Sequence, residues 1–240
     1  MKDMLAILAN AVLMLTYPIL RHRRPMVRYS FSYGDLRFLC PGGFYGMLGL
    51  ASSEPSVKNV LEVERSGDAI DVGANIGFYS ILLSRFTGRV IAVEPDPFYF
   101  EYLLTNISVN GCTNVIPFRM AAWSAEEDLN LIRPLSGVPL DSHVMKGDAA
   151  DNPSAKVRAR TLDALARETG CHPSIVKIDA EGAEAEVLLG MQRVMTLDRP
   201  VIVFEARKET IHKCQEILSQ KGFEVSMMPD GNYLAQPKRE

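Results

Sequence analysis

A short apolar strand that ends in an acid and opens into a glycine turn constrains the fold of this chain more than any other feature. It is the run Ala69-Ile70-Asp71-Val72-Gly73-Ala74-Asn75-Ile76-Gly77-Phe78. Glycine takes positive φ without strain, so Gly73 and Gly77 predict a tight turn whose backbone a ligand can approach closely. Helix-compatible residues follow over 76–86, and the first amides of such a helix have no partners within it and can point at a ligand. The run predicts a nucleotide-binding βα unit.

A second apolar strand, residues 90–93, ends in Glu94-Pro95. A carboxylate at this position can accept hydrogen bonds from two ribose hydroxyls. It favours a diol over a phosphate, because a phosphate would bring a second negative charge. The two strands together predict an adenosine pocket with Asp71, Gly73, Ala74, Asn75, Gly77, Phe78, Glu94 and Pro95 at the cofactor.

Two classes of cofactor use such a layout. A dinucleotide site requires the pattern G-x-G-x-x-G, whereas this chain has G-x-x-x-G between Gly73 and Gly77. Asp71 would also repel a pyrophosphate but attract the cationic amino-acid end of S-adenosylmethionine. Charge therefore favours the methyl donor over NAD. A glycine turn in an ordinary α/β unit without a ligand is the alternative.

From residue 68 onward, apolar strand patterns alternate with helical ones, which predicts βαβ units and a mainly parallel sheet with helices on both faces. A helix is expected from Pro97 to a stop at Asn110-Gly111, followed by a strand over 114–118. Ala121 and Ala122 then follow that strand. Their small side chains either leave room for the adenine ring or only pack in the core, and both readings stay open.

The second constellation is the buried strand Ser174-Ile175-Val176-Lys177-Ile178-Asp179, followed by Ala180-Glu181-Gly182. Lys177 and Asp179 share one face of the strand, so we expect them to pair. Asp179 ends the strand, and parallel sheets bind their ligands at that edge. Either Asp179 or Glu181 can accept a proton from a substrate hydroxyl, with Lys177 beside them. The alternative is that the ion pair only stabilises the strand.

Residues 124–160 do not fit another βα unit. Residues 129–132 and 157–160 are candidate strands, and Pro and Gly residues between them indicate irregular chain. Insertions of this length are usually functional, so we expect the segment to face the substrate. His143 is its most notable polar residue, although a lone histidine in a loop is more often solvated than catalytic.

The N-terminal part is expected to have two pieces. Residues 4–20 carry no charge, are marginally short for a membrane span and precede the basic collar 21–24. A helix on the cytoplasmic face of a membrane, a helix packed on this protein or a partner, and a signal peptide all remain open. Residues 25–67 predict a hairpin with its turn at Gly34-Asp35 and a brief helix over 57–63, together a lid or flank for the pocket.

Composition sets outer limits on the function. The chain has 240 residues, 47% of them hydrophobic and 23% charged, so it can bury a full core. A net charge of −3 gives no general attraction to nucleic acid, which is therefore not favoured as a partner. The cysteines and histidines are too scattered for a structural zinc site, so no metal is expected: Cys40, Cys112, Cys171, Cys214, His22, His143, His172 and His212. The spacing of the four cysteines is typical of reduced thiols in the cytoplasm.

Three motifs in order carry a family resemblance over about residues 68–206. Asp71-Val72-Gly73-Ala74-Asn75-Ile76-Gly77, then Arg160-Thr161-Leu162-Asp163-Ala164-Leu165, then Lys177-Ile178-Asp179-Ala180-Glu181-Gly182-Ala183-Glu184 resemble the FkbM family of S-adenosylmethionine-dependent methyltransferases. The resemblance implies a class I methyltransferase fold and, most often, O-methylation of a hydroxyl on a sugar, glycan or natural product. Matched residues 71–77 and Glu94 would hold the cofactor, and Asp179 and Glu181 would line the reaction site.

The fold expected for residues 68–240 is a Rossmann-like, mainly parallel seven-stranded sheet that ends in an antiparallel hairpin around residues 229–232. Asp163 matches the family pattern, but it is equally well explained as a first-turn helix acid after a Thr161 cap. An RNA base methyltransferase and a non-catalytic, membrane-attached cofactor-binding module are the alternative functions. The acceptor and the oligomeric state do not follow from the sequence.

Overall fold

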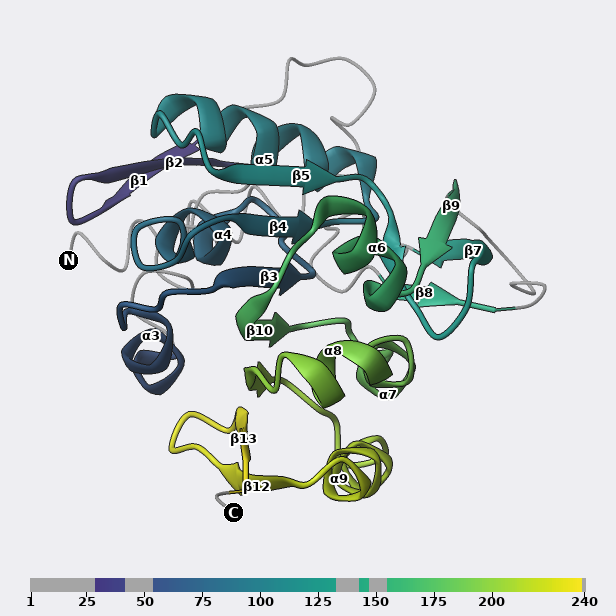
Figure 1. The fold of residues 1–240 in the computed structure, drawn as a ribbon. Helices are drawn as coiled ribbons and strands as arrows, with labels where there is room; N and C mark the ends of the chain where they lie inside the picture. The colour runs from purple at the N-terminus through teal and green to yellow at the C-terminus, as the bar shows by residue number, and fades with distance from the viewer. Residues whose placement is uncertain (1–28, 42–53, 133–142, 147–154, 239–240) are drawn as a thin grey trace, which may run out of the picture.

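The computed structural model describes residues 29–41, 54–132, 143–146 and 155–238. Its central sheet has seven strands: β3 (Asp68–Val72), β4 (Val90–Val93), β5 (Val115–Phe118), β10 (Pro173–Ile178), β11 (Val201–Phe204), β12 (Phe223–Met227) and β13 (Tyr233–Pro237). Their spatial order is β12-β13-β11-β10-β3-β4-β5 (Figure 1). All neighbours pair in parallel except β13, which is antiparallel to both β11 and β12. The predicted sheet and C-terminal hairpin are confirmed.

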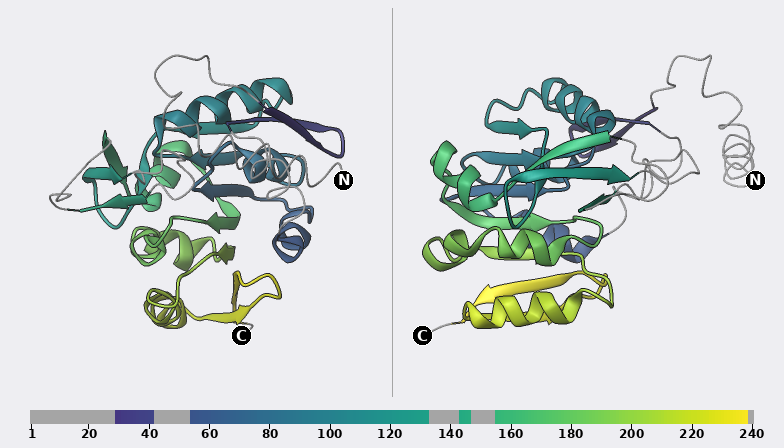
Figure 2. Two further views of the ribbon diagram at one scale, coloured as in Figure 1. Left: turned by 180° about the vertical axis from the view of Figure 1, so that it is seen from behind. Right: turned by 90° about the vertical axis from the view of Figure 1, so that its right-hand side faces the viewer.

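Two hydrophobic clusters cover the two faces of this sheet. The first face carries the hairpin β1 (Tyr29–Tyr33) and β2 (Leu36–Cys40), with α3 (Pro55–Leu61), α4 (Phe78–Leu83) and α5 (Pro97–Val109). The second face carries α6 (Leu162–Thr169), α7 (Glu184–Leu189), α8 (Gln192–Leu197) and α9 (Ile211–Gln220) (Figure 2). Alternation along β3 sends Ile70 and Val72 to the second face and Ala69 to the first. The sheet is thus buried on both sides, as its apolar strands require.

A smaller sheet stands beside the carboxyl edge of the central one (Figure 1). It contains β6 (Ala121–Ala122), β7 (Glu127–Ile132), β8 (His143–Met145) and β9 (Ala155–Arg160), in the order β6-β9-β7-β8. The two strands expected inside 124–160 are confirmed as parts of β7 and β9. Strand β8 and the pairing of β6 with β9 were not predicted, and the described residues of the segment form a sheet.

Two helices show how local chemistry sets their ends. Helix α5 begins at Pro97 behind Asp96, whose carboxylate accepts a hydrogen bond of 2.8 Å from the Phe98 amide, and it stops before Asn110, as predicted. Helix α4 is shorter than the predicted 76–86. It starts only after Gly77, because the positive φ of that residue, 90°, lies outside the helical region.

The hairpin β1-β2 forms with its turn at Gly34-Asp35, as predicted. It packs against α4 and α5, where the rings of Phe31 and Phe38 stack at 5.2 Å and Phe38 lies 5.1 Å from the Phe78 ring. None of the hairpin residues lines the cleft described below. The described hairpin therefore flanks the core, and the role of residues 25–67 as a lid or flank for the pocket stays a prediction.

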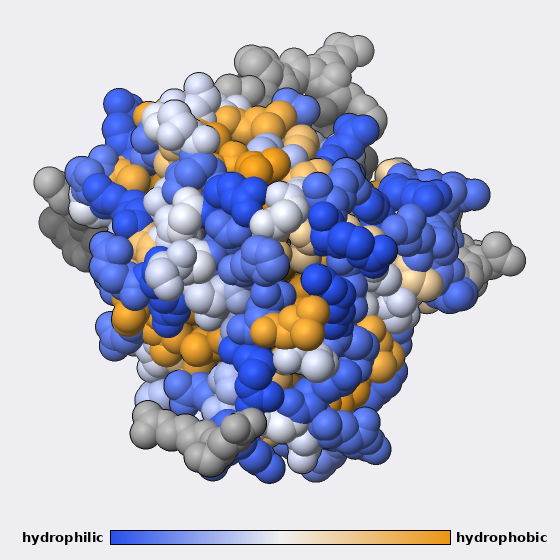
Figure 3. All heavy atoms as spheres, viewed as in Figure 1, coloured by the Kyte–Doolittle hydropathy of each residue, from blue (hydrophilic) through white to orange (hydrophobic). Residues whose placement is uncertain are grey.

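On the face drawn in Figure 3, hydrophobic residues lie in separate patches among polar ones. Among the residues that the structure describes, no helix has both the length and the apolar character needed to cross a membrane. The predicted apolar helix and its basic collar, residues 4–24, lie outside the described residues.

Candidate active site

A cleft opens at the carboxyl edge of the central sheet, where β3 and β10 lie side by side and the strand order reverses. Open parallel sheets bind their ligands at such a switch point. Residues that follow β3, β4 and β10 form its walls together with residues of α5, β6 and β8: Val72, Gly73, Asn75, Val93, Glu94, Pro95, Tyr99, Ala121, Ala122, His143, Val144, Asp179, Ala180 and Glu181.

The cleft brings together eight of the residues expected at the site: Gly73, Asn75, Glu94, Pro95, Ala121, Ala122, Asp179 and Glu181. Five others lie behind its walls: Asp71, Ala74, Gly77, Phe78 and Lys177. The side chain of Phe78 packs with the hairpin rings, on the face of the sheet that carries α4. These five residues do not line the described walls, so their contact with a ligand stays a prediction.

The two glycines of the turn are required by packing between protein segments. A Cβ on Gly73, whose φ is 73°, would lie 1.8 Å from the carbonyl oxygen of Asp179. A Cβ on Gly77 would lie 2.6 Å from Leu103 Cδ1 on α5. Close approach of a ligand was the expected reason for both and stays a prediction, and the structure adds packing as a second reason. The turn after β3 rests directly on the turn after β10, which holds Asp179 at the cleft.

Glu94 joins two strand ends. Its Oε2 accepts a hydrogen bond of 2.7 Å from the Asn75 amide, and its Oε1 accepts one of 2.8 Å from the Asp96 amide. Burial raises the pKa of this carboxyl to about 8, although the two amide bonds favour the charged form. Each oxygen keeps a second lone pair for a ligand. Asn75 itself has a φ of 52°, and such strained positions are common at binding sites.

Asp71 and Lys177 are fully or almost fully buried behind the cleft, with 0% and 5% of their surface exposed. Asp71 accepts a hydrogen bond of 2.5 Å from Ser80 Oγ on α4. Burial raises its pKa, while the positive charge of Lys177 and the Ser80 hydrogen bond oppose that rise. Asp71 was expected to attract the amino-acid end of a cofactor. The nearby cation that the structure shows is Lys177, and the attraction of a cofactor by Asp71 stays a prediction.

Lys177 reaches the cleft through Asp179. Its Nζ lies 3.3 Å from Asp179 Oδ2 and 4.9 Å from the centroid of the Tyr79 ring. Burial lowers the pKa of the ammonium, but Asp179 and Asp71 outweigh this and the pKa is raised. The expected pairing of Lys177 with Asp179 is confirmed. It leaves the Asp179 side chain 35% exposed at the cleft and oriented by a buried charge.

Two further acids lie near Asp179, and one of them, Glu181, lines the cleft. Glu181, with a φ of 50°, accepts a hydrogen bond of 2.9 Å from Arg207. Glu205 follows β11 directly, as Asp179 follows β10, and its amide donates to the Ile178 carbonyl at 3.0 Å. Burial raises the pKa of Glu205 to about 7, and the charges of Asp179 and Glu181 add to the effect. Sequence reasoning missed Glu205, although its place after a buried strand is a usable signal.

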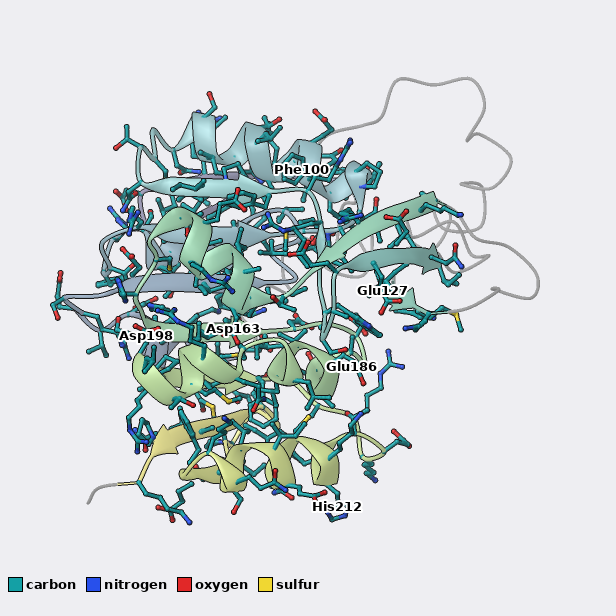
Figure 4. The ribbon with its side chains drawn as sticks, turned by 45° about the vertical axis from the view of Figure 1, so that its right-hand side comes forward. Phe100, Glu127, Asp163, Glu186, Asp198 and His212 are labelled. Carbon is teal, nitrogen blue, oxygen red and sulfur yellow. The ribbon has the colours of Figure 1, made fainter. Side chains whose placement is uncertain are left out.

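The smaller sheet of β6, β7, β8 and β9, called the insertion sheet below, is anchored to the core beside the cleft by hydrogen bonds and an ion pair. Ser124 Oγ donates a hydrogen bond of 2.6 Å to Glu186 on α7, and Lys213 Nζ lies 3.0 Å from the same carboxylate. Figure 4 shows Glu186 between the core helices and the insertion sheet. Ala121 and Ala122 are both buried, line the cleft and pair with β9, and their contact with an adenine ring stays a prediction.

The described cleft walls contain three acids, Glu94, Asp179 and Glu181, and neither lysine nor arginine. A dinucleotide pyrophosphate would therefore find no lysine or arginine in these walls to balance its charge. A ligand with a ribose diol and a cationic sulfonium matches these groups, because Glu94 can accept from the hydroxyls and the carboxylates attract the cation. The small side chains of Ala121 and Ala122 and the ring of Pro95 belong to the same walls.

A sequence model of the methyltransferase FkbM domain matches residues 71–225, which is more than half of the chain. The chain belongs to the FkbM methyltransferase family. Its cofactor is accordingly S-adenosylmethionine, in agreement with the chemistry of the cleft walls. Glu94 and Asn75 would hold the ribose and Ala121 and Ala122 would face the adenine.

Two curated proteins are similar in sequence to parts of this chain. The chain is 31% identical over 157 residues to the hexuronic acid methyltransferase AglP of Haloferax volcanii. The match covers 64% of this chain and 62% of that protein. The chain is 31% identical over 110 residues to a tRNA/tmRNA (uracil-C(5))-methyltransferase of Azotobacter vinelandii, covering 45% of this chain and 30% of that protein. The chain thus spans less than two thirds of the length of these curated relatives.

A solved structure of an FkbM methyltransferase from Methylobacillus flagellatus superposes with a TM-score of 0.51 at 19% sequence identity. The match covers 76% of this chain and 50% of that one. At this identity the likeness concerns the fold alone, and it agrees with the class I sheet order described above.

Proposed function

We propose that this FkbM family member transfers the methyl group of S-adenosylmethionine to a hydroxyl group on a sugar or glycan. The observation that carries the proposal is the position of Asp179 in the cleft wall, where the buried Lys177 orients it at 3.3 Å. The relative named as a hexuronic acid methyltransferase supports a sugar acceptor.

The chemistry needs little more than positioning. Bound S-adenosylmethionine supplies an already activated methyl group. The protein holds the acceptor oxygen about 3 Å from that carbon and in line with the bond that breaks. Asp179 accepts the hydroxyl proton as the new O–C bond forms, with Glu181 as the alternative base, and Lys177 keeps the carboxylate turned toward the cleft.

The test separates chemistry from cofactor binding. Asp179→Asn should lower the rate of methyl transfer by about 10²-fold or more, the usual contribution of a general base. Calorimetry should show S-adenosylmethionine binding close to that of the wild type. Asp128→Asn on β7, an exposed carboxylate, is the matched control and should leave both unchanged. An Asp179→Asn enzyme with full activity would reject the assignment.

An RNA acceptor is the second candidate, because two curated tRNA methyltransferases match part of the chain at 30% and 31% identity. The acids in the described cleft walls argue against a polyanion there. A methyl-transfer screen over glycosides, glycolipids and RNA, with mass detection of the product, distinguishes the two acceptors. RNA binding that weakens steeply with salt would favour the second one. Cofactor binding without transfer to any acceptor would favour a non-catalytic module.

We also propose that residues 4–24 attach the enzyme to the cytoplasmic face of a membrane, through the apolar run and its basic collar. Sedimentation with vesicles tests this. Binding should increase with the anionic lipid content and be lost in a variant whose collar residues Arg21, Arg23 and Arg24 are changed to glutamine.

A further inference from the structure

His143 stands in the wall of the cleft, although no step of the proposed reaction uses it. It begins β8, the outermost strand of the insertion sheet, and it lines the same cleft as Asp179 and Glu181. The other described histidines lie elsewhere. His172 contacts Asp198, and His212 lies on α9, away from the insertion sheet in Figure 4.

The position of His143 is held by the pairing of β8 with β7 and by the packing of its neighbour Val144. In the antiparallel ladder of β7 and β8, Ile132 faces His143 and Leu131 faces Val144. Val144 packs on a small apolar cluster that includes Leu131 and Ala183, and Ala180 packs on the same cluster. Ala180 lies between Asp179 and Glu181 in the chain. The cluster therefore joins the strand that carries the imidazole to the turn that carries the two acids.

The polar groups at this part of the cleft differ in what they can bind. Asp179 and Glu181 are acceptors when ionised, and each already contacts a cation of the protein, Lys177 and Arg207. A neutral imidazole offers one donor and one acceptor. A sugar with adjacent hydroxyls fits both kinds of group, because one hydroxyl can donate to Asp179 while its neighbour hydrogen bonds to the ring.

The same walls disfavour an acidic sugar. The described lining contains neither lysine nor arginine, and Lys177 and Arg207 outside it already contact Asp179 and Glu181, so a uronate carboxylate would lie beside acids without a lysine or arginine of its own in these walls. A like charge in a partly buried site is costly, because the surroundings screen it less than water does. The acceptor that suits this arrangement is a neutral sugar.

We propose that His143 is an acceptor-binding residue, which hydrogen bonds the hydroxyl next to the methylated one on a neutral sugar. The proposal rests on the proposed function. It assigns the insertion sheet a direct part in acceptor recognition, through a residue that the cleft places beside the reaction site.

Kinetics with methyl glycosides of neutral hexoses, and with the matching uronates, test the assignment. His143→Ala should raise KM for the neutral glycoside by about tenfold, the effect of one lost hydrogen bond, while kcat changes little. His143→Gln should recover part of the loss, because its amide also offers a donor and an acceptor. His212→Gln is the matched control and should behave as the wild type. The wild type should prefer neutral glycosides to uronates.

A second measurement does not depend on turnover. The imidazole resonances are followed by NMR in the chain saturated with S-adenosylhomocysteine while the neutral glycoside is added. The resonance that is missing in His143→Gln should shift, and those of His172 and His212 should stay in place. An unchanged KM in His143→Ala, an unmoved resonance or a preference for uronates would overturn the assignment.

These measurements distinguish a failure of the role of His143 from a failure of the proposed function. If the chain methylates a glycoside and His143→Ala does so with the wild-type KM, only the role of His143 fails. If no glycoside is methylated and the NMR titration shows no binding, the proposed function fails, and the role of His143 fails with it.

Discussion

The carboxylate of Glu94 accepts a hydrogen bond of 2.7 Å from the backbone amide of Asn75, which joins the end of β4 to the turn that follows β3. This contact forms although Glu94 is buried and its pKa is raised to about 8. The group expected to bind the cofactor ribose is therefore only partly ionised near neutral pH. Ligand binding at this carboxyl should depend on pH.

Adenosine is the probe that isolates this effect, since it keeps the ribose and adenine and lacks the titrating amino-acid end. Its hydroxyls bind the ionised carboxylate best, so its affinity should increase as the pH rises toward and through 8, by at most about tenfold per pH unit for one linked proton. Glu94→Gln should bind weakly with no such dependence. Calorimetry with 2′-deoxyadenosine is the control. A flat wild-type profile would reject the ribose assignment.

The buried charges behind the cleft predict a stability effect. Lys177→Met leaves the carboxylate of Asp71 buried without its nearby cation, and removing one partner of a buried pair typically costs about 3–5 kcal/mol. The free energy of unfolding, measured in urea, should fall by roughly that amount. The double variant Lys177→Met/Asp71→Asn should recover most of it. A double variant no more stable than the single one would contradict the account.

The pH dependence of that loss has a definite sign. Burial raises the pKa of Asp71 in the folded state above that in the unfolded chain, and loss of Lys177 would raise it further. The destabilisation relative to the wild type should therefore be small while Asp71 is protonated in both folded proteins. It should grow as the pH rises from the folded-state pKa of the wild type to the higher folded-state pKa of the variant. Urea unfolding of Lys177→Met across this range should show a larger deficit at higher pH.

Some of this site follows from local sequence patterns and some does not. The strand that ends at Val72, the turn at Gly73 and the final hairpin are encoded by neighbouring residues, because apolar runs and turn residues act over a few positions. The partner of Asp71 depends on the pairing of β3 with β10, which lie about a hundred residues apart in the chain. Residue spacing alone carries no signal for that register.

The insertion sheet shows a second limit. Strand β8 has only three residues, so it is too short for the alternation that identifies a strand, and His143 was assigned to a loop. Gly77 shows a third. Leu103, on a helix that follows in the chain, leaves no room for a Cβ at position 77. A turn pattern cannot distinguish that packing contact from the approach of a ligand.

Asp163 is expected to stabilise the fold through a helix other than its own. Its two carboxylate oxygens accept hydrogen bonds of 2.8 Å from the Arg193 amide and 2.9 Å from the Val194 amide, at the start of α8. Helix α8 has no capping side chain of its own. Asp163→Ala should lower the free energy of unfolding by about 1–2 kcal/mol, the usual loss for a cap.

The control for Asp163 is an exposed acid. Asp128→Ala removes a carboxylate 3.9 Å from Arg158 and should change stability by less than about 0.5 kcal/mol. Asp163→Ala should also bind S-adenosylmethionine like the wild type, since Asp163 does not line the cleft. A selective loss of cofactor binding without a loss of stability would return Asp163 to the site.

Asn106 should hold the hairpin against the core. It is fully buried on α5, where its Oδ1 accepts from the Leu39 amide at 2.7 Å and its Nδ2 donates to the carbonyls of Leu39 and Ile76 at 2.9 and 2.8 Å. Asn106→Ala leaves three backbone groups without partners, so we expect the free energy of unfolding in urea to fall by about 2–4 kcal/mol.

Asn110 provides the control, because it makes the same pair of hydrogen bonds to the backbone of Arg37 at a more exposed position. Asn110→Ala should lower the free energy of unfolding by less than about 1 kcal/mol, because water replaces the lost side chain. Hydrogen exchange should show faster exchange in β2 than in β10 for Asn106→Ala. Equal losses in the two variants would mean that burial does not decide the strength of this contact.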